Sequence, residues 1–410
     1  MASAPPVRRT SSGQSPSLRE HSLVPVGMAT ILPESACQVR HLEAELLASC
    51  HRFGYDEIIL PTFEYLDVLA PGLEPTLLEN SYKIVDRTTG RILLLRPDVT
   101  AQIARSVAMG MVGTGFPLRL SYRATVFRYE PEHAGRDREI FQVGAELIGA
   151  DDASADSEII ILLIECLRQV GLRSFKISLG HVGFFKGLLI RAGLSPEGQK
   201  RAEHAAARRD LPRLGEILSQ ERVTKRSAHR ILDVLELCGQ AEVLSKGRTL
   251  AKGERPLVQA LDRLENVYQL LCATGFQETV LLDLGEFRGF DYYDGIVFDV
   301  FTEGIGVELG GGGRYDQLIG RFGRNLPSTG FALTVDRLFR GLSLPDRTKS
   351  VGPNILVVAP RGLSTQLVSV AQRLRQAGIR TVQQAVDPSG RDLVDVAVKT
   401  GLEANIGTII

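Results

Sequence analysis

Two segments with alternating apolar and polar residues, joined by a polar stretch, form the clearest pattern in the chain. Apolar and polar residues roughly alternate over residues 118–127, and a second apolar run with polar residues at alternate positions covers residues 140–148. Between them, residues 131–138 are rich in proline, glycine and charge. Period-two alternation is typical of a strand with one buried face, and a short polar segment between two such strands is typical of a hairpin. The pattern therefore predicts an antiparallel hairpin.

The polar positions of this hairpin are expected to share one face. Gln142, Gly144 and Glu146 are spaced two residues apart, so on a strand they point the same way. Arg128 and Glu130, at the end of the first strand, are expected to point inward beside them. This convergence of charged and amide groups predicts a polar pocket on a sheet. A hairpin face exposed to solvent is the alternative.

A helical pattern precedes the hairpin near the N-terminus. Leu42 and Leu46 fall on one stripe of a helix that Gly54 is expected to end. Residues 57–60 then predict a short strand, which Pro61 stops. Without further context, an ordinary buried helix–strand unit explains this segment.

Residues 92–105 predict a strand, a turn at Pro97 and a helix. Asp98 or Thr100 is expected to cap the N-terminus of that helix, because their side-chain oxygens accept hydrogen bonds from free backbone N–H groups. Helix capping alone would explain an aspartate at position 98, and a role in ligand binding would explain it equally well.

The remaining pattern of the first three quarters of the chain is mixed helix and strand. It predicts a helix over residues 157–172, a strand over 175–179, charged helices over 195–257, a helix over 267–275, strands within 280–301, and a strand over 327–334 with a helix from Val335. The four glycines at 310–313 predict a close approach of the backbone to a bulky group. No GK[ST] follows them, so they do not form a P-loop. His181, beside glycines, is expected to be a turn or core residue without chemistry.

The last part of the chain predicts a separate small unit. Residues 343–353 have the composition of a linker. Residues 354–410 then predict a β-α-β-α-β order, with the second helix near residues 392–399. Three parallel strands with two helices are enough for a small α/β domain.

Composition indicates an ordinary globular protein. The 410 residues are 44% hydrophobic and carry no net charge, with a pI near 7.1, which disfavours a broad nucleic-acid surface. Five scattered cysteines contain no CxxC pair, so they predict free thiols rather than disulfides or a zinc site. The longest apolar run, residues 159–164, is too short to cross a membrane. We expect a cytoplasmic protein without metal or cofactor, and a disordered tail over residues 1–22.

Several motifs, in order, resemble those of histidyl-tRNA synthetases. FRYE, a charged loop ending in GRDRE, and FQVGAELIG (residues 127–149) resemble the second signature motif of class II aminoacyl-tRNA synthetases. FRGFDYYDGIVFDVF (287–301) resembles the histidine-binding segment. GGGGRYDQLIG (310–320) and STGFALTVDRL (328–338) resemble the glycine-rich strand and the third motif. The helix and strand before Pro61 resemble the first motif, which forms the dimer interface in the family.

Three features favour a non-ligating branch of this family, the regulatory subunits of ATP phosphoribosyltransferase. The synthetases have LRPEGT where this chain has LRPDVT, so Asp98 replaces a glutamate. The segment GHVGFFKGLL (180–189) closely resembles the regulatory subunits. The C-terminal unit is shorter than the anticodon-binding domain that it resembles.

The resemblance implies a binding site for free histidine. It assigns the imidazole to Glu146 and Tyr293, the ammonium group to Asp98, Thr100 and Gln142, and the carboxylate to Arg288. Tyr315 would close the pocket, and Arg128 and Tyr292 belong to the same implied set. No catalytic residue is expected.

The resemblance also implies a remnant of a nucleotide site. Arg128, Glu130 and Arg337 match nucleotide-contacting positions of the synthetases, which keeps ATP chemistry open as an alternative. Glu132, in place of a basic or polar loop residue, disfavours adenylate formation because a carboxylate near a triphosphate is repelled. Two further positions depart from the synthetase pattern. This chain has Asp336 where the synthetases have a glutamate, and Phe141 where they have a histidine.

The sequence therefore predicts an α+β fold, with a class II synthetase-like antiparallel sheet flanked by helices. The expected domains are a synthetase-like domain over residues 23–342 with a helical insertion at about 195–257, and a truncated anticodon-binding-like α/β domain over 354–410. The expected function is a histidine-binding regulatory subunit that forms a homodimer and joins a short catalytic subunit. Histidyl-tRNA synthetase is the alternative, and a histidine-binding pseudo-enzyme with another target is a third hypothesis. Binding of tRNA or of a membrane is not expected.

Overall fold

The computed structural model describes residues 24–113, 115–129, 138–286, 292–342, 355–386 and 408–409. The chain divides into two compact units, Met1–Leu342 and Ser343–Ile410. The expected tail over residues 1–22 and the expected linker over 343–353 lie outside the described residues.

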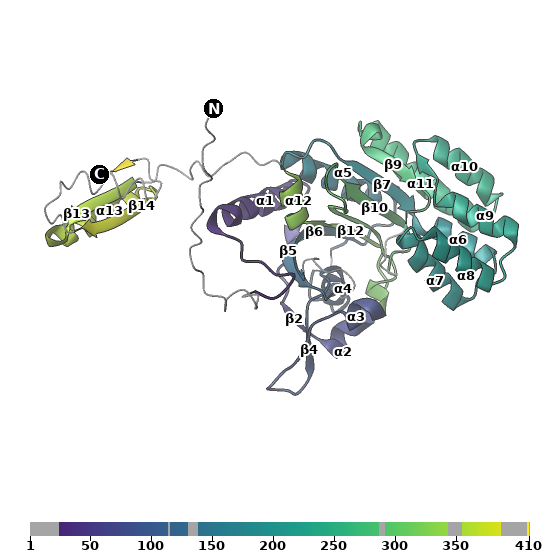
Figure 1. The fold of residues 1–410 in the computed structure, drawn as a ribbon, viewed down its shortest axis with the longest axis horizontal. Helices are drawn as coiled ribbons and strands as arrows, with labels where there is room; N and C mark the ends of the chain where they lie inside the picture. Colours follow the sequence, from purple (N-terminus) through teal and green to yellow (C-terminus); the bar gives the residue numbers. More distant parts are fainter. Residues whose placement is uncertain are drawn as a thin grey trace, which may run out of the picture. The chain divides into compact units, whose positions relative to one another are not determined.

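A nine-stranded, mostly antiparallel sheet forms the centre of the first unit (Figure 1). Its strand order is β1 (Asp56–Glu57), β5 (Leu118–Phe127), β6 (Glu139–Ile148), β12 (Ser328–Thr334), β11 (Gly310–Arg314), β10 (Ile296–Phe301), β7 (Lys176–His181), β9 (Val280–Asp283) and β8 (Cys238–Gly239). Every neighbouring pair is antiparallel except β1–β5 and β7–β9. The predicted α+β class, with an antiparallel sheet flanked by helices, is confirmed.

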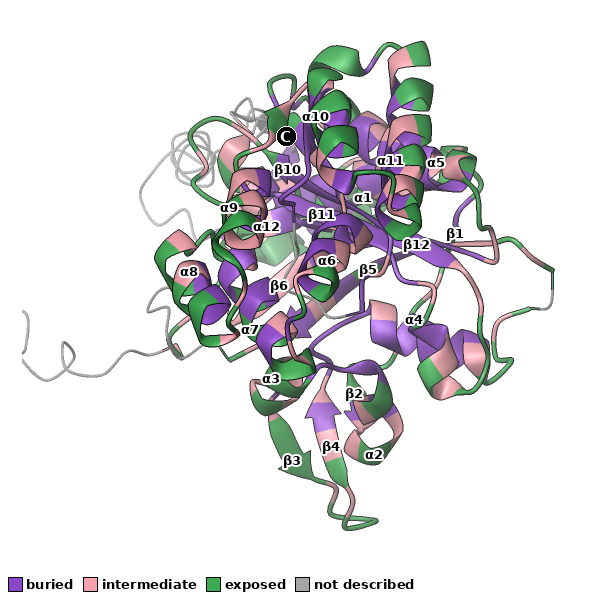
Figure 2. Cartoon of the chain, turned by 90° about the vertical axis from the view of Figure 1, so that its right-hand side faces the viewer, coloured by how far each residue is buried: buried purple, intermediate pink, exposed green. Residues whose placement is uncertain are grey.

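Helices α1 (Pro33–Arg52), α5 (Ala153–Gln169), α11 (Arg255–Ala273) and α12 (Val335–Gly341) cover the sheet and enclose its core. Figure 2 shows the buried residues concentrated on the strands and on the inward sides of these helices. Arg119 on β5 donates a 2.8 Å hydrogen bond to Glu158 on α5, and Arg314 on β11 donates one of 2.8 Å to Asp156 on the same helix. The strand registers place Glu146 on the other face of the sheet. One face therefore packs on α5, and the opposite face is available for a site.

The charged stretch over residues 195–257 is helical, as predicted, with one exception. It contains α7 (Pro196–Ala207), α8 (Leu211–Gln220), α9 (Lys225–Val234) and α10 (Glu242–Ala251), after α6 (Val182–Arg191). Between α9 and α10, β8 pairs with β9 and forms the last strand of the sheet. The prediction missed this strand because two residues are too few to show a periodic pattern.

A second, three-stranded sheet follows α1. It has the order β2 (Phe63–Tyr65), β4 (Ile92–Leu95) and β3 (Lys83–Val85), with α2 (Leu66–Leu69) and α3 (Pro75–Glu79) in the connections. After β4 the chain turns into α4 (Thr100–Ala108), so the predicted strand, turn and helix are confirmed. This segment brings the N-terminus of α4 to the central sheet.

The strand predicted at residues 57–60 is shorter and begins earlier than expected. Only Asp56–Glu57 pairs with β5, although the N–H of Ile58 still donates a 2.8 Å hydrogen bond to Ser121. Ile59 is 86% exposed, so the chain has left the sheet before it reaches Pro61. Proline has no N–H to continue the ladder, which explains why no strand extends across this position.

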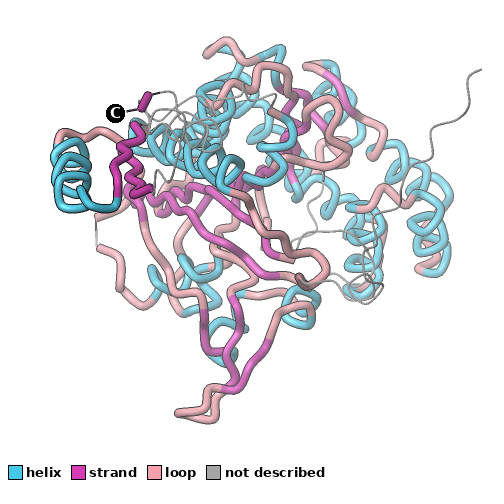
Figure 3. Tube along the Cα trace, turned by 60° about the vertical axis from the view of Figure 1, so that its left-hand side comes forward, coloured by secondary structure: helices cyan, strands magenta, loops and turns pink. Residues whose placement is uncertain are grey.

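The second unit has its own small parallel sheet (Figure 3). The described elements are β13 (Ile355–Pro360), α13 (Ser364–Gln376), β14 (Thr381–Val386) and β15 (Thr408–Ile409), with the strand order β14-β13-β15. Ile355, Val357 and Leu367 form its core. The helix predicted near residues 392–399 lies outside the described residues.

Candidate histidine-binding pocket

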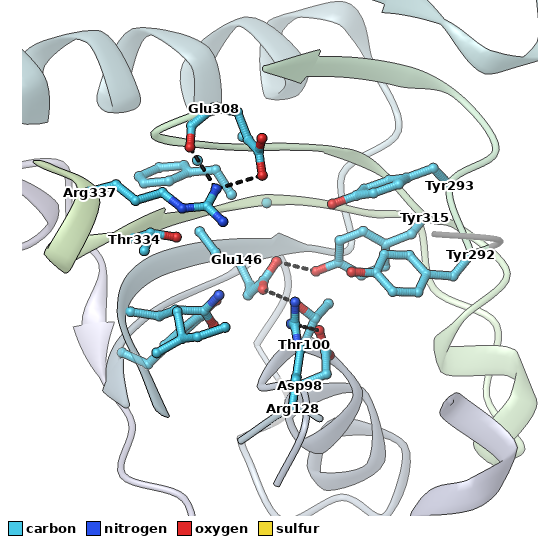
Figure 4. Close-up of a pocket in the computed structure, with 18 residues that line it drawn as sticks. Asp98, Thr100, Arg128, Glu146, Tyr292, Tyr293, Glu308, Tyr315, Thr334 and Arg337 are labelled. Carbon is cyan, nitrogen blue, oxygen red and sulfur yellow. Dashed lines mark hydrogen bonds and ion pairs between the residues drawn. The ribbon is translucent and has the colours of Figure 1, made fainter. Parts of the chain in front are cut away.

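A pocket lies on the face of the central sheet opposite α5 (Figure 4). It encloses about 680 Å³ of empty space, including the part that opens to solvent. Nine residues selected from the sequence line it: Asp98, Thr100, Arg128, Gln142, Glu146, Tyr292, Tyr293, Tyr315 and Arg337. These residues come from segments that are more than two hundred positions apart in the chain, and the fold brings them together.

Strand β6 supplies the acidic centre of the pocket. Glu146 pairs with Gly330 of β12, and Gln142 pairs with Thr334 at the end of the same strand. Both side chains therefore point to the pocket face, as the period-two pattern predicted. Arg128, one residue beyond β5, also lines the pocket.

Glu146 is held from two sides. The Thr100 hydroxyl donates a 2.8 Å hydrogen bond to Oε1, and the Tyr315 hydroxyl donates one to Oε2. Glu146 is only 1% exposed, and this burial raises the pKa of its carboxyl to about 8, with a further increase from the nearby charge of Asp98. The two hydrogen bonds lower the pKa but do not offset the effect of burial. Near neutral pH the empty pocket therefore holds Glu146 mostly in its protonated form.

Asp98 both caps a helix and lines the pocket, whereas the sequence left helix capping and ligand binding as alternatives. Its Oδ1 accepts a 2.7 Å hydrogen bond from the N–H of Ala101 in the first turn of α4, so the side chain caps this helix. Asp98 also lines the pocket, and its Oδ2 lies 3.9 Å from Nη2 of Arg128. Burial raises the pKa of Asp98, while Arg128 and the backbone hydrogen bonds lower it.

The two arginines of the pocket are both engaged within the chain. Arg128 donates a 2.8 Å hydrogen bond from Nε to the carbonyl of Pro97 and faces Asp98. Nη1 of Arg337 donates to the carbonyl of Glu308 at 2.7 Å and to its carboxylate at 2.6 Å. Each guanidinium therefore faces a carboxylate of the same protein.

Three tyrosines form an aromatic wall. The ring centroids of Tyr292 and Tyr293 are 4.7 Å apart, and those of Tyr292 and Tyr315 are 5.8 Å apart in an edge-to-face arrangement. Burial raises the pKa of Tyr292 and of Tyr315 well above the ordinary value. Their hydroxyls therefore stay protonated and able to donate hydrogen bonds, while the rings offer apolar contact to a flat ligand group.

Some of the selected residues lie outside the described part of the chain. These are Arg288, assigned to the ligand carboxylate, and Glu130 and Glu132 of the hairpin loop. Their roles stay predictions.

The prediction missed several lining residues, of which Tyr122, Glu308 and Thr334 carry polar groups. Tyr122 pairs with Gly144, so the hairpin periodicity contained the signal that would have found it. Glu308 precedes the glycine run without any periodic pattern. Its place in the pocket depends on how β11 and β12 pair, and this pairing cannot be read from local sequence.

Two groups that might suggest metal or catalytic chemistry have structural explanations. His181 caps α6, since its Nδ1 accepts a 3.1 Å hydrogen bond from Gly183, and burial lowers the pKa of its imidazole to about 4. His181 is the last residue of β7, and its side chain caps the helix that follows. Within the described ranges, no group of three or more His, Cys, Asp or Glu residues could hold a metal ion, and all five cysteines are free thiols. The described helices include none that is long and apolar enough to cross a membrane.

The pocket therefore suits a small polar ligand with positive charge. Its carboxylates and amide can accept hydrogen bonds from a cation, and its tyrosines can contact a ring. Both arginines among the described lining residues already face carboxylates, so these two offer little unshared positive charge.

Comparison with known proteins identifies similar sequences and structures. The family model of histidyl-tRNA synthetase matches residues 27–338. The ATP phosphoribosyltransferase regulatory subunit of Desulforamulus reducens is 38% identical over 87% of this chain and 88% of its own length. That of Moorella thermoacetica is 39% identical over 92% of this chain and 96% of its own length.

Solved structures share the fold. The crystal structure described as an ATP phosphoribosyltransferase regulatory subunit/histidyl-tRNA synthetase from Bacillus halodurans superposes with a TM-score of 0.80, at 29% identity over 97% of this chain and 98% of its own. Histidyl-tRNA synthetase from Nostoc superposes with a TM-score of 0.76 at 21% identity, covering 93% of this chain and 89% of its own. The second likeness concerns the fold alone.

Proposed function

Because this chain belongs to the family of ATP phosphoribosyltransferase regulatory subunits, we propose that it binds free L-histidine in the pocket on β6 and thereby controls a catalytic partner. The chain is a regulatory subunit of ATP phosphoribosyltransferase, an enzyme of histidine biosynthesis. Its relatives' names fit the expected non-catalytic role. The proposal adds to this family assignment a binding site for free histidine.

The observation that carries the proposal is the grouping of Asp98, Thr100, Gln142 and Glu146 around one pocket. A buried ammonium group needs several hydrogen-bond acceptors, and an imidazole N–H needs one more. Asp98, Thr100 and Gln142 offer oxygen atoms for the ammonium group. Glu146 accepts hydrogen bonds from the hydroxyls of Thr100 and Tyr315, and it can also accept one from the imidazole.

The aromatic wall supports the same orientation. Tyr293 lines the pocket, and its ring centroid is 6.5 Å from that of Tyr315, whose hydroxyl bonds to Glu146. An imidazole placed against Glu146 would contact these rings on its flat faces. Arg288, outside the described residues, is the proposed partner of the ligand carboxylate.

Calorimetric titration of the purified chain with L-histidine tests the proposal. Glu146→Ala should weaken binding by about 1–3 kcal/mol, the scale for leaving a buried hydrogen-bonding group of the ligand without its partner. Glu158→Ala is a matched control, because it removes a carboxylate from α5, on the opposite face of the sheet. If Glu146→Ala and the wild type bind histidine equally well, the proposed place of the imidazole is wrong.

L-Histidinol offers a second titration that addresses Arg288. This ligand lacks the carboxylate, so its loss of affinity relative to histidine should be large in the wild type and small in Arg288→Ala. If histidinol loses the same affinity relative to histidine in both proteins, Arg288 does not bind the ligand carboxylate.

We also propose that two copies of the chain pair through residues 35–66. The support is the edge strand β1, which has a partner on one side only in the sheet order, and the exposed Ile59 beside it. Sedimentation should give about twice the monomer mass of 44.8 kDa, and Ile59→Lys should weaken the dimer. A monomeric wild type at micromolar concentration would contradict this pairing.

A further inference from the structure

Glu308 and Arg337 form a close contact at one end of the pocket. Figure 4 shows them together at the opposite end from Asp98 and Arg128. One nitrogen of Arg337, Nη1, donates to both the carbonyl and the carboxylate of Glu308, at 2.7 and 2.6 Å. The arginine side chain is 21% exposed and that of Glu308 is 39% exposed, so the contact is partly shielded from water. Both residues line the pocket.

The backbone holds this contact in place. Glu308 lies just before β11, and the next residue, Leu309, donates a 2.8 Å hydrogen bond to Val300 of β10. Leu309 also accepts a 2.9 Å hydrogen bond from Thr334, the last residue of β12. Arg337 lies in the first turn of α12, which begins directly after Thr334. The pair therefore joins two segments whose relative position is fixed by the sheet.

Among the lining residues that the structure describes, the charges balance when this pair is counted. The described lining residues include three acids (Asp98, Glu146 and Glu308) and two bases (Arg128 and Arg337). Glu146 is mostly protonated near neutral pH because burial raises the pKa of its carboxyl to about 8. Each of the other two acids faces one arginine, at 3.9 Å for Asp98 and 2.6 Å for Glu308.

Nucleoside triphosphates carry several negative charges, and a protein site for them must supply cations that are not already neutralised. In this pocket an incoming phosphate would compete with the Glu308 carboxylate for the guanidinium of Arg337. It would also lie beside that carboxylate, where like charges repel. A zwitterionic amino acid faces no such competition at the end of the pocket where Glu146 lies.

We propose that Glu308 excludes nucleoside triphosphates from this pocket by holding Arg337, and so makes the pocket selective for a free amino acid. Glu308 thus acts as a specificity-determining residue. The inference rests on the proposed function in one respect, since it assumes that the pocket is a ligand site.

The test is a calorimetric titration of the full chain with Mg·ATP. Glu308→Ala should bind Mg·ATP at least about tenfold more tightly than the wild type, the scale expected for a charged hydrogen bond. Glu308→Gln should gain affinity in the same direction, because it keeps the size of the side chain and removes its charge. The gain should disappear in the double variant Glu308→Ala/Arg337→Ala.

A matched control is Glu303→Gln, which removes the same charge from an exposed turn five residues away. It should leave ATP affinity at the level of the wild type. Because Glu308→Gln conserves volume, it decides the outcome if Glu308→Ala does not fold.

Two results would overturn the inference. In one, neither Glu308 variant binds Mg·ATP more tightly than the wild type. In the other, the gain survives the loss of Arg337 or is equally large in Glu303→Gln. A parallel titration with L-histidine distinguishes this inference from the proposed function. Failure of every protein to bind histidine would refute the histidine site. The ATP titrations would still test the role of Glu308.

Discussion

Gly330 on β12 is the cross-strand partner of Glu146 on β6, and a Cβ atom at Gly330 would lie 1.6 Å from Oε2 of Glu146. The carboxylate of Glu146 thus occupies the space that any other residue at position 330 would fill. This explains how a long acidic side chain can lie flat on the sheet, within reach of Thr100 and Tyr315.

Gly330→Ala should therefore abolish or strongly weaken histidine binding. The added methyl group must displace the Glu146 carboxylate, at a cost on the scale of overpacking, about 1–3 kcal/mol. Gly306→Ala is the control, since no heavy atom lies within 4 Å of a Cβ at that position. Calorimetry measures the affinity, and circular dichroism shows whether both variants are folded. Unchanged affinity in a folded Gly330→Ala protein would mean that Glu146 does not contact the ligand.

Asp98→Ala and Asp152→Ala should separate helix capping from ligand binding. Both aspartates cap a helix, Asp98 through the N–H of Ala101 and Asp152 through that of Ala155. Each variant should lose about 1 kcal/mol of unfolding free energy from its cap. Only Asp98→Ala should also lose histidine affinity, because only Asp98 lines the pocket. Equal histidine affinity in the two variants would mean that Asp98 caps the helix and does not bind the ligand.

The titration of Glu146 should appear in the stability of the empty chain. Its folded pKa of about 8 lies above the ordinary value of 4.5, so between these values the folded chain keeps a proton that the unfolded chain has released. This group therefore favours folding at low pH, and its contribution is lost as the pH rises from about 4.5 through about 8, by at most about 1.4 kcal/mol per pH unit. Denaturant unfolding of the wild type and Glu146→Gln at about pH 6 and about pH 9 measures it. Relative to the wild type, Glu146→Gln should gain stability as the pH rises, and a constant difference would contradict the protonated state.

The sequence predicted elements best where local chemistry marks their ends. The helix predicted to start at Val335 begins at that residue, directly after the apolar strand Ser328–Thr334. The strand, turn and helix at residues 92–105 follow from an apolar run, Pro97 and a capping aspartate. In each case the signal lies within a few residues of the element itself.

The sequence did not reveal features that depend on strand pairing. The contact between Glu308 and Arg337 spans 29 positions and exists because Gly310 pairs with Leu333. Because such contacts are set by the register of strands distant in sequence, the acidic partner of Arg337 could not be predicted.

The two compact units should separate without loss of the histidine site. All described lining residues belong to the first unit, and the small core of Ile355, Val357 and Leu367 belongs to the second. Limited proteolysis should cleave within the predicted linker, residues 343–353, and the fragment that ends there should bind histidine within about twofold of the full chain. Resistance of that segment, or loss of binding after cleavage at that segment alone, would contradict the proposed domain boundary.

The most direct test of regulation by histidine is a reconstituted assay of phosphoribosyl transfer. The catalytic subunit from the same organism is assayed with ATP and phosphoribosyl pyrophosphate, alone and with this chain, over a range of histidine concentrations. The account predicts that this chain alters the activity, that histidine inhibits the complex, and that Glu146→Ala keeps the complex but shifts inhibition to higher histidine. A coupling of about 1–3 kcal/mol would change the apparent histidine affinity by about 5- to 150-fold when the partner binds. A catalytic subunit that is equally active and equally inhibited by histidine without this chain would contradict the account.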